Sequence, residues 1–301
     1  MAFVPRTPFE WRLHTRTLAL GPRTLLMGIL NVTPDSFSDG GQFSSIKTAL
    51  DQALRLLDEG ADILDLGGES TRPNATSITP VEEQARVIPV LAEILKARPD
   101  TIVSMDTFHA STARFAVESG AEIVNDVSGF TWDGQMAKTC AGLGCGVVLM
   151  HTRGRPQEWL TQPPLAPTDI LPLVIDGLAD SLRDAYKVGI AEDQIVLDPG
   201  FGFGKLGDEN YTLLAHLDRL QQLGRPVLAG ISRKGFLART LTPLHDGAMP
   251  AADSKARIRA TSAANVAAIL AGAHVLRVHD LRPAVEAAAI ADAILAGATP
   301  Q

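Results

Sequence analysis

Short apolar runs rich in β-branched residues recur along the chain, each followed by a polar or glycine-rich loop and then by a stretch of helical periodicity. The runs are apolar over nearly their whole length, as is typical of parallel strands that are buried on both faces. Eight such runs predict eight strands, which we place at Leu25–Val32, Asp62–Leu66, Thr101–Asp106, Ile123–Val127, Val147–His151, Ile195–Asp198, Val227–Ser232 and His274–His279.

The stretches between these runs carry apolar residues at helical spacing. After position 45, for example, Ile46, Leu50 and Leu57 fall on one face of a helix. Similar stretches predict further helices at about 80–97, 109–119, 133–142, 169–188, 209–223, 253–271 and 281–296. Eight strand–helix units in a chain of 301 residues indicate a (β/α)8 TIM barrel, with a doubly wound open sheet as the structural alternative.

The N-terminal segment has a different pattern. Apolar and polar residues alternate from Trp11 to Leu20, and a Gly-Pro pair then precedes the first barrel strand. This alternation predicts a β-hairpin within an N-terminal extension over residues 1–23. The segment is also rich in Arg and poor in acidic residues, which weakly resembles a transit peptide. Since no linker or low-complexity tract follows, we expect one domain over residues 1–301.

Composition narrows the class of function. The formal net charge is −7 and 46% of the residues are hydrophobic, which fits an acidic globular enzyme and argues against nucleic-acid binding. No apolar run approaches the roughly 18 residues of a membrane-spanning helix. We therefore expect a cytoplasmic protein that binds neither nucleic acid nor membranes.

Polar residues gather where the predicted strands end. In a TIM barrel, the C-terminal ends of the strands surround one mouth, and the active site lies there. Any single polar residue at such a position could instead cap a helix or fix a loop. Their convergence on one mouth nevertheless predicts a site for small molecules. The candidates are Asn31, Asp106, Asn125, Asp126, Met150, His151, Asp198, Ser232, Arg233, Lys234, Arg277 and His279.

The last predicted strand carries a candidate anion site. Arg277 and His279 are two positions apart, so their side chains share one face of the strand. With Asn31 and Arg72 they could bind phosphate, because a guanidinium group binds phosphate oxygens in a bidentate manner. The alternative is that Arg277 pairs with Asp280 or with another neighbouring carboxylate.

The run Gly200–Lys205 alternates glycine with phenylalanine. It is not a dinucleotide fingerprint, because it does not open a helix at once and no acidic ribose ligand follows at the required distance. Its aromatic residues instead predict a wall that packs against a flat substrate, with an ordinary glycine loop as the alternative.

Eight segments taken together resemble the dihydropteroate synthase family. They occur in the order and at the intervals of that family, and the resemblance covers about residues 24–296. The segments are MGILNVTPDSFSDGG (27–41), DLGGESTRP (65–73), SMDT (104–107), NDVSG (125–129), LMH (149–151), DPGFGFGK (198–205), ISRKGFL (231–237) and LRVHD (276–280).

The resemblance implies a transferase of folate biosynthesis that joins 6-hydroxymethyl-7,8-dihydropterin diphosphate to p-aminobenzoate and releases pyrophosphate by dissociative substitution. The implied pterin site consists of Asp106, Asn125, Met150, Asp198, Phe203 and Lys234. The implied diphosphate site consists of Asn31, Arg72, Arg277 and His279, and Mg²⁺ is expected there with Asn31 as its protein ligand. The implied catalytic residues are Asp106, Lys234, Arg277 and His279. On this basis we expect that loss of Arg277 reduces turnover and spares pterin binding.

The resemblance also implies a p-aminobenzoate site nearer the mouth, formed by Phe37, Thr71, Pro73, Phe203, Lys234 and Gly235. Many members of the family have Ser where this chain has Gly235, so one hydroxyl contact is missing while the backbone donors remain. A homodimer and competition between sulfonamides and p-aminobenzoate are further implications of the resemblance.

Three other functions remain open at this point. A pterin-binding methyltransferase barrel would share the pterin pocket but lack the segments TPDSFSDGG and ESTRP, which this chain contains. A non-catalytic pterin-binding relative would need a lost catalytic group, and none is lost. An aldolase barrel would need a Schiff-base lysine or a carbonyl-activating metal site, and Lys234 fits the pterin role better.

Overall fold

The chain is a closed barrel of parallel strands in a computed structural model that describes residues 3–33, 41–70 and 77–298, without the side chains of 41–44. The eight-stranded parallel sheet runs in the order β8-β7-β6-β5-β4-β3-β10-β9, and a parallel bridge between Leu197 and Val227 closes β8 onto β9. The strands are β3 (Leu25–Asn31), β4 (Ile63–Gly67), β5 (Ile102–Asp106), β6 (Ile123–Asp126), β7 (Gly146–Met150), β8 (Ile195–Asp198), β9 (Leu228–Ala229) and β10 (Val275–Val278).

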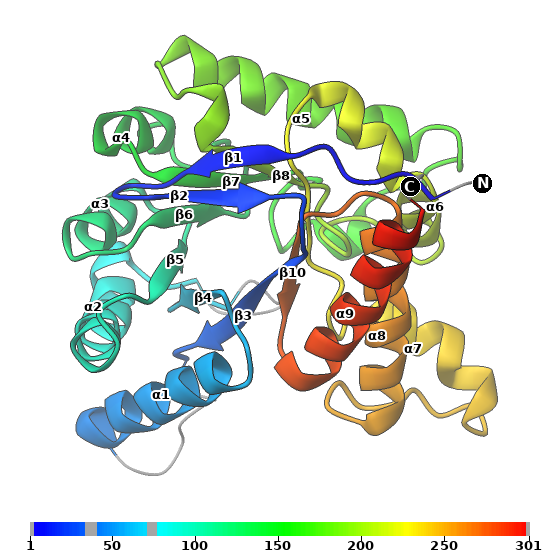
Figure 1. Cartoon of the computed structure of the whole chain (residues 1–301), viewed down its shortest axis with the longest axis horizontal. Coiled ribbons are helices and arrows are strands. Elements are labelled where there is room, and N and C mark those ends of the chain that lie inside the picture. The colour runs from blue at the N-terminus through cyan, green and yellow to red at the C-terminus, as the bar shows by residue number, and fades with distance from the viewer. Residues whose placement is uncertain (1–2, 34–40, 71–76, 299–301) are drawn as a thin grey trace.

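Helices cover the outside of the barrel and alternate with its strands (Figure 1). They are α1 (Gly41–Asp58), α2 (Pro80–Ala97), α3 (Ala110–Glu118), α4 (Met136–Leu143), α5 (Ile170–Lys187), α6 (Glu209–Ala215), α7 (Gly235–Leu241), α8 (Lys255–Leu270) and α9 (Leu281–Gly297), with 3₁₀ turns η2 (Trp159–Thr161), η3 (Glu192–Gln194), η4 (Leu217–Leu223) and η5 (Thr242–Leu244). Local sequence explains the start of α2, where Thr79 and Glu82 form a capping box and Pro80 occupies the first turn.

Two elements differ from the prediction. The helix expected at 209–223 divides into α6 and the 3₁₀ segment η4, whose buried residues Leu217 and Leu220 keep a three-residue spacing that suits a 3₁₀ helix. The strand expected at Val227–Ser232 contains only the two residues of β9, because the chain turns at Arg233, whose φ is 58°. The predicted TIM barrel is otherwise confirmed.

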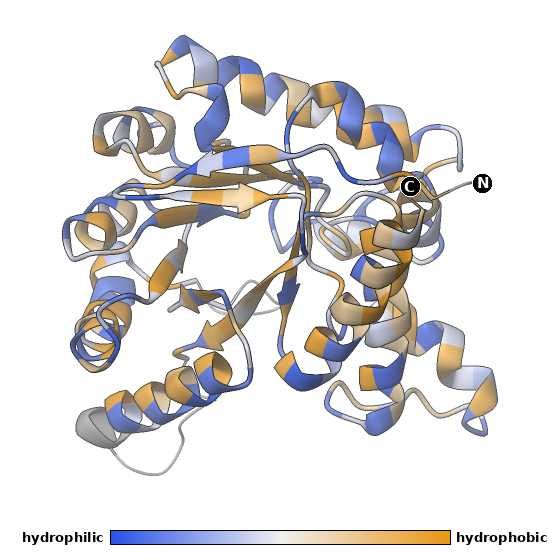
Figure 2. Ribbon diagram, viewed as in Figure 1, coloured by the Kyte–Doolittle hydropathy of each residue, from blue (hydrophilic) through white to orange (hydrophobic). Residues whose placement is uncertain are grey.

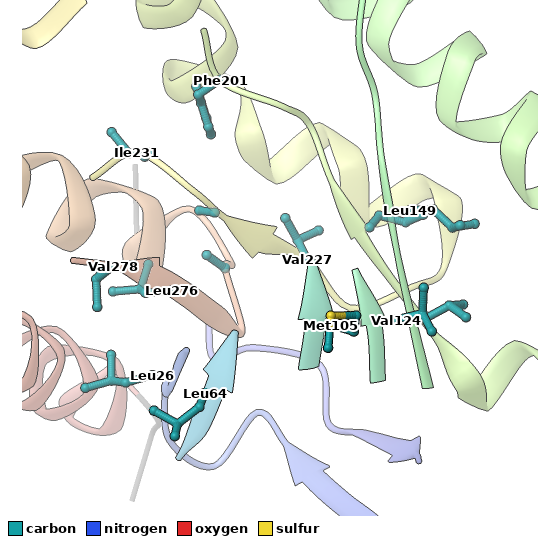
Figure 3. Packing of buried hydrophobic residues seen from close by; sticks show 14 of the residues in the cluster. Leu26, Leu64, Met105, Val124, Leu149, Phe201, Val227, Ile231, Leu276 and Val278 are labelled. Carbon is teal, nitrogen blue, oxygen red and sulfur yellow. The ribbon is translucent and has the colours of Figure 1, made fainter. Parts of the chain in front are cut away.

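Alternate residues of the strands face two separate layers of core. One set, including Leu26, Leu64 and Met105, packs against the helices (Figure 3). The other set points into the barrel and fills its N-terminal end, with Leu25, Met27 and Ile63 among its members. Figure 2 shows largely apolar strands, surrounded by helices that carry both apolar and polar residues. Polar side chains inside the barrel are therefore expected at the opposite, C-terminal end.

The predicted N-terminal hairpin is confirmed and closes the N-terminal end of the barrel. It consists of β1 (Phe9–Arg12) and β2 (Thr17–Leu20), which pair antiparallel. Trp11 is fully buried against the inward-facing strand residues, and its Nε1 donates to the Gln194 carbonyl oxygen at 2.9 Å. The hairpin thus excludes water from the end of the barrel opposite the mouth.

The segment before the hairpin is also tied to the barrel. Arg6 forms an ion pair with Asp292 of α9 at 2.6 Å and donates to the Ala273 carbonyl oxygen at 3.0 Å. Next to it, the His274 Nδ1 accepts from the Val227 N–H at 3.2 Å, and Nε2 contacts the Thr7 carbonyl oxygen at 3.0 Å. A carbonyl oxygen can only accept, so Nε2 carries the proton and the ring is neutral.

This histidine predicts an acid-dependent loss of stability. Burial lowers the pKa of His274 to about 4, so between pH 6.5 and 4 the unfolded chain binds a proton that the folded protein does not. The free energy of unfolding should therefore fall over this window, by up to about 3 kcal/mol from this residue. His274→Gln keeps one acceptor and one donor, and urea unfolding should show its stability approaching that of the unmodified protein as the pH falls. The matched change at exposed His245 should give a constant difference, and a constant difference for His274→Gln would contradict the prediction.

Candidate active site

A fully buried carboxylate, Asp65, organises the C-terminal half of the barrel interior. Its Oδ1 accepts from the Ser104 Oγ at 2.7 Å, and its Oδ2 accepts from the Asn125 Nδ2 at 3.0 Å and from the Arg277 Nε at 2.6 Å. These four residues come from β4, β5, β6 and β10. A buried carboxylate is stable only when paired and hydrogen-bonded, and here both oxygens are satisfied.

Arg277 crosses the barrel interior from β10 and joins two carboxylates. Its Nε meets Asp65 at 2.6 Å and its Nη2 meets the Asp106 Oδ2 at 2.5 Å. Burial alone would lower the pKa of Arg277, but Asp65 and Asp106 together raise it above its usual value. Asp280, the alternative partner considered from sequence, instead binds Arg233 through two hydrogen bonds of 2.9 and 2.6 Å.

Two ionisable groups at this mouth have pKa values that are shifted toward neutral pH in opposite directions. Burial raises the pKa of Asp106 to about 7, although Arg277 opposes the shift. Burial lowers the pKa of Lys234 to about 7, with a further contribution from the positive charge of Arg277. Groups whose protonation is balanced near pH 7 are typical of binding and catalytic sites.

An apolar wall lies beside these charges. Met150 and Phe203 are buried in one cluster with Trp159, and the rings of Phe203 and Trp159 meet edge to face with centroids 4.9 Å apart. The Lys234 Nζ lies 3.7 Å from the centroid of the Phe203 ring, a close cation–π contact. A flat ligand could lie against this wall while its edge meets the polar groups.

Asp198 completes the polar edge. It ends β8, its Oδ1 accepts from the Gly200 N–H at 2.7 Å, and burial raises its pKa. A β-carbon placed on Gly230 would lie 3.5 Å from the Asp198 Oδ2 and 3.9 Å from the Arg277 Cβ, so both side chains border the space that this glycine leaves open. The structure therefore brings Asp106, Asn125, Asp198 and Lys234 to one mouth, together with the apolar residues Met150 and Phe203.

Asn31 and Asp106 bring oxygen atoms together beside Gly67. A β-carbon on Gly67 would lie 3.6 Å from the Asn31 Oδ1 and 3.5 Å from the Asp106 Oδ2. Glycine at the end of β4 thus keeps an amide oxygen and a carboxylate oxygen accessible from the same side. Among the residues that the structure describes, no group of three or more His, Cys, Asp or Glu side chains could hold a metal ion by itself.

His279 is neutral and oriented by a hydroxyl group. The Ser232 Oγ accepts from the His279 backbone N–H at 3.2 Å and lies 3.0 Å from its Nδ1, to which the hydroxyl can donate. This arrangement leaves the proton on Nε2, where it can be donated to an anion. Burial, aided by Arg277 and Arg233, lowers the pKa of His279 to about 3.

Four of the predicted site residues lie outside the described residues, namely Phe37, Thr71, Arg72 and Pro73. Gly235 is exposed at the first position of α7, directly after Lys234.

Sequence reasoning gave no role to Asp65 or Ser104, and it listed Ser232 as a candidate without a specific role. A signal for Asp65 was available, because a charged residue in the middle of the apolar run ILDLG is rarely fully buried without a partner. No sequence pattern shows that its partner is Arg277, which lies 212 positions away along the chain.

Comparison with known proteins shows the family to which the chain belongs. The family model described as pterin binding enzyme matches residues 27–279. The curated dihydropteroate synthase of a Synechocystis strain is 38% identical over 97% of this chain and 94% of its own length. A structure of the Xanthomonas albilineans dihydropteroate synthase with 4-aminobenzoic acid has a TM-score of 0.84 at 40% identity, covering 98% of this chain and 100% of that one. The Yersinia pestis enzyme with a sulfonamide drug has a TM-score of 0.83 at 36% identity, covering 95% and 98%.

The fold, the polar mouth and the family match define the class, so the chain belongs to the pterin-binding enzymes. Within them it belongs to the dihydropteroate synthases, which are transferases of folate biosynthesis.

The ion pairs of Arg277 change the expected effect of removing it. Without this cation, Asp65 repels Asp106 and burial raises the pKa of Asp106 further, so Asp106 loses the charged form that accepts most strongly. We therefore expect Arg277→Met to weaken binding of a pterin that lacks the diphosphate by about tenfold or more, and not turnover alone.

Calorimetric titration with a 6-hydroxymethylpterin would test this expectation. Arg282→Met removes an exposed arginine from the helix that follows and should leave pterin affinity unchanged. Unchanged pterin affinity in Arg277→Met would restrict Arg277 to the diphosphate and restore the expectation from sequence.

Proposed function

We propose that the enzyme condenses 6-hydroxymethyl-7,8-dihydropterin diphosphate with p-aminobenzoate to give 7,8-dihydropteroate and pyrophosphate. The observation that carries this proposal is the pairing of Arg277 with Asp65 and Asp106 beside Asn125, Asp198 and Lys234. Such a set offers both acceptors and donors to one flat heterocycle.

The pterin would bind through its aminopyrimidinone edge. Carboxylates at Asp106 and Asp198 suit its N–H donors, and Lys234 can donate to its ring carbonyl. One N–H of Asn125 is held by Asp65, which leaves the amide oxygen and the second N–H for the ligand. Met150 and Phe203 would contact the ring faces. A ligand without these donors and acceptors would leave buried polar groups unpaired, which gives the site its specificity.

The diphosphate would lie toward Asn31, Arg72, Arg277 and His279. Nε2 of neutral His279 and the guanidinium of Arg277 can donate to oxygens that become more negative as the bond to the pterin methylene breaks. We propose that pyrophosphate leaves before the arylamine attacks, since the arylamine is a weak nucleophile and the pterin ring can delocalise positive charge. The Asp106 carboxylate would offset that charge, and Lys234 would hold the ring in place.

Mg²⁺ would fit at the diphosphate. The oxygens of Asn31 and Asp106 both lie near Gly67, and oxygen is the ligand that Mg²⁺ prefers. Asn31 is the proposed protein ligand, and the diphosphate and water would provide the remaining ligands. When bound, Mg²⁺ would neutralise charge on the leaving group.

The p-aminobenzoate would bind nearer the solvent, between Phe203 with the aliphatic part of Lys234 and the segments that carry Phe37, Thr71 and Pro73. Gly235 would offer its backbone N–H to the carboxylate, without the hydroxyl that many relatives have there. The contact between Lys234 and Phe203 supports this arrangement, because it joins the two residues that the pterin and p-aminobenzoate sites share.

We further propose a cytoplasmic homodimer whose ligands are small molecules, with no binding to nucleic acid or membranes. Ile290 and Ile294 on α9 are 63% and 36% exposed, an apolar pair one helical turn apart that a second subunit could cover. No helix in the described parts of the chain is long and apolar enough to cross a bilayer. The formal charge of −7 is unfavourable for polyanions.

The reaction itself gives the first test. Purified protein supplied with the dihydropterin diphosphate, p-aminobenzoate and Mg²⁺ should release pyrophosphate in a 1:1 ratio with dihydropteroate, as measured by a coupled phosphate assay and by chromatography. A chelator should stop the release because it removes charge neutralisation at the leaving group, and excess Mg²⁺ should restore it. Pterin binding without release would refute the synthase and leave a pterin-binding protein.

Inhibition by a sulfonamide tests the second pocket. A sulfonamide resembles p-aminobenzoate in shape and charge, so it should raise the apparent KM for p-aminobenzoate without changing kcat. Phe203→Leu should weaken both ligands by a similar factor, about three- to tenfold, because it shortens the shared aromatic wall. Uncompetitive inhibition, or a weaker affinity of Phe203→Leu for only one of the two ligands, would show that the two ligands occupy different places.

A further inference from the structure

Lys205 lies in the glycine-rich loop between β8 and α6, and its side chain does not face the substrate space. It is only 3% exposed, and its Nζ points into the interior of its own loop. A lysine that follows a Gly-Phe-Gly-Phe-Gly run would suggest a phosphate ligand from sequence alone. The geometry excludes that use, because protein carbonyls occupy all of its donors.

The Lys205 ammonium group binds three backbone carbonyl oxygens. It donates to the Gly200 oxygen at 2.8 Å, to the His151 oxygen at 3.0 Å and to the Phe203 oxygen at 3.4 Å. An ammonium group has three donors, so each of them has a partner. His151 follows β7 and the other two residues follow β8, so this one side chain fastens two neighbouring loops together.

The glycine-rich loop requires such bonds to keep one backbone conformation. Gly200, Gly202 and Gly204 have φ values of 68°, 80° and 72°, a region that glycine enters freely and leaves just as freely. Other bonds also hold the loop: the Gly202 N–H donates to the Asn210 Oδ1 at 2.7 Å, and the Arg153 Nη1 donates to the Gly204 oxygen at 3.0 Å. The Arg153 backbone N–H reaches the Phe203 carbonyl oxygen at 3.3 Å, so Lys205 shares this carbonyl with the loop that follows β7.

Phe203 depends on this loop for its position. Its ring must lie under the Lys234 Nζ and against Trp159 to form the apolar wall of the pocket. We propose that Lys205 is a positioning residue for the p-aminobenzoate pocket, fixing the Phe203 ring by holding the carbonyls of the loop from within. The proposal rests on the proposed function, because the pocket is defined by that reaction.

The protonated form of Lys205 is required for this role. A neutral amine has only two donors and would lose one of the three bonds that join the two loops. Burial lowers the pKa of Lys205 to about 7, aided by Lys234 and Arg153, while Asp198 and Glu209 favour the charged form. Because Asp198 is also a pterin ligand in the proposed function, the ammonium additionally compensates charge beneath the pterin edge.

Steady-state kinetics on Lys205→Met and Lys205→Arg would test the proposal. Methionine fills a similar volume without a donor, whereas arginine keeps the charge and several donors. With saturating dihydropterin diphosphate, Lys205→Met should raise the KM for p-aminobenzoate by at least about tenfold while kcat falls by less. Pterin affinity, measured by calorimetry, should fall by a clearly smaller factor, since Asp106, Asn125 and Lys234 keep their places although Phe203 and the charge near Asp198 are affected. Lys205→Arg should recover much of the lost affinity.

The matched control is Lys138→Met, which removes an exposed lysine from α4 and should leave all constants unchanged. An unchanged KM for p-aminobenzoate in folded Lys205→Met, or an equal loss of p-aminobenzoate and pterin binding, would overturn the proposal. If that variant does not fold, Lys205→Gln, which keeps two donors on a shorter side chain, must show the same KM increase. Absence of pyrophosphate release by the unmodified protein would instead refute the proposed function, so the two failures are distinguishable.

Discussion

The arrangement of the mouth depends on one electrostatic requirement, the neutralisation of the Asp65 carboxylate inside a closed barrel. An isolated charge at that depth would cost several kcal/mol, so it must be paired and fully hydrogen-bonded. Arg277 meets this requirement from β10, which is separated from β4 by one strand, and its Nη2 donates to Asp106. The second oxygen of Asp65 shares Asn125 with the pterin edge. Two residues of the proposed pterin site therefore take their orientation from a residue that need not touch the substrate.

The two ends of the barrel have different roles: the N-terminal end contributes stability, and the C-terminal end carries the chemistry. At the N-terminal end, Trp11 and the inward-facing strand residues form a dry apolar plug. At the C-terminal end, buried charges lie close together, and the pKa values of Asp106 and Lys234 both approach 7. Such a cluster is costly to fold and is retained where binding uses it. The apolar plug supplies stability that offsets this cost without approaching the site.

Sequence patterns predicted the barrel well because buried parallel strands are continuous apolar runs, and seven of the eight expected runs overlap the observed strands over nearly their full length. They also located the polar strand ends, since these are local features. They did not predict the pairing of Asp65 with Arg277 or the bond from Lys205 to the His151 carbonyl, because both depend on which residues meet across space. The length of β9 was overestimated because its apolar run continues to Ile231, whereas the strand itself ends at Ala229.

The ion pair between Arg6 and Asp292 brings the first and last described parts of the chain side by side, on the side of the barrel away from the mouth (Figure 1). The position along the sequence at which the series of eight strand–helix units begins is therefore not essential to the architecture. The ends could be joined by a short linker and new ends opened in a turn at the hairpin side, which would give a circular permutant with an unaltered mouth. A fusion partner attached on that side would likewise leave substrate entry unobstructed.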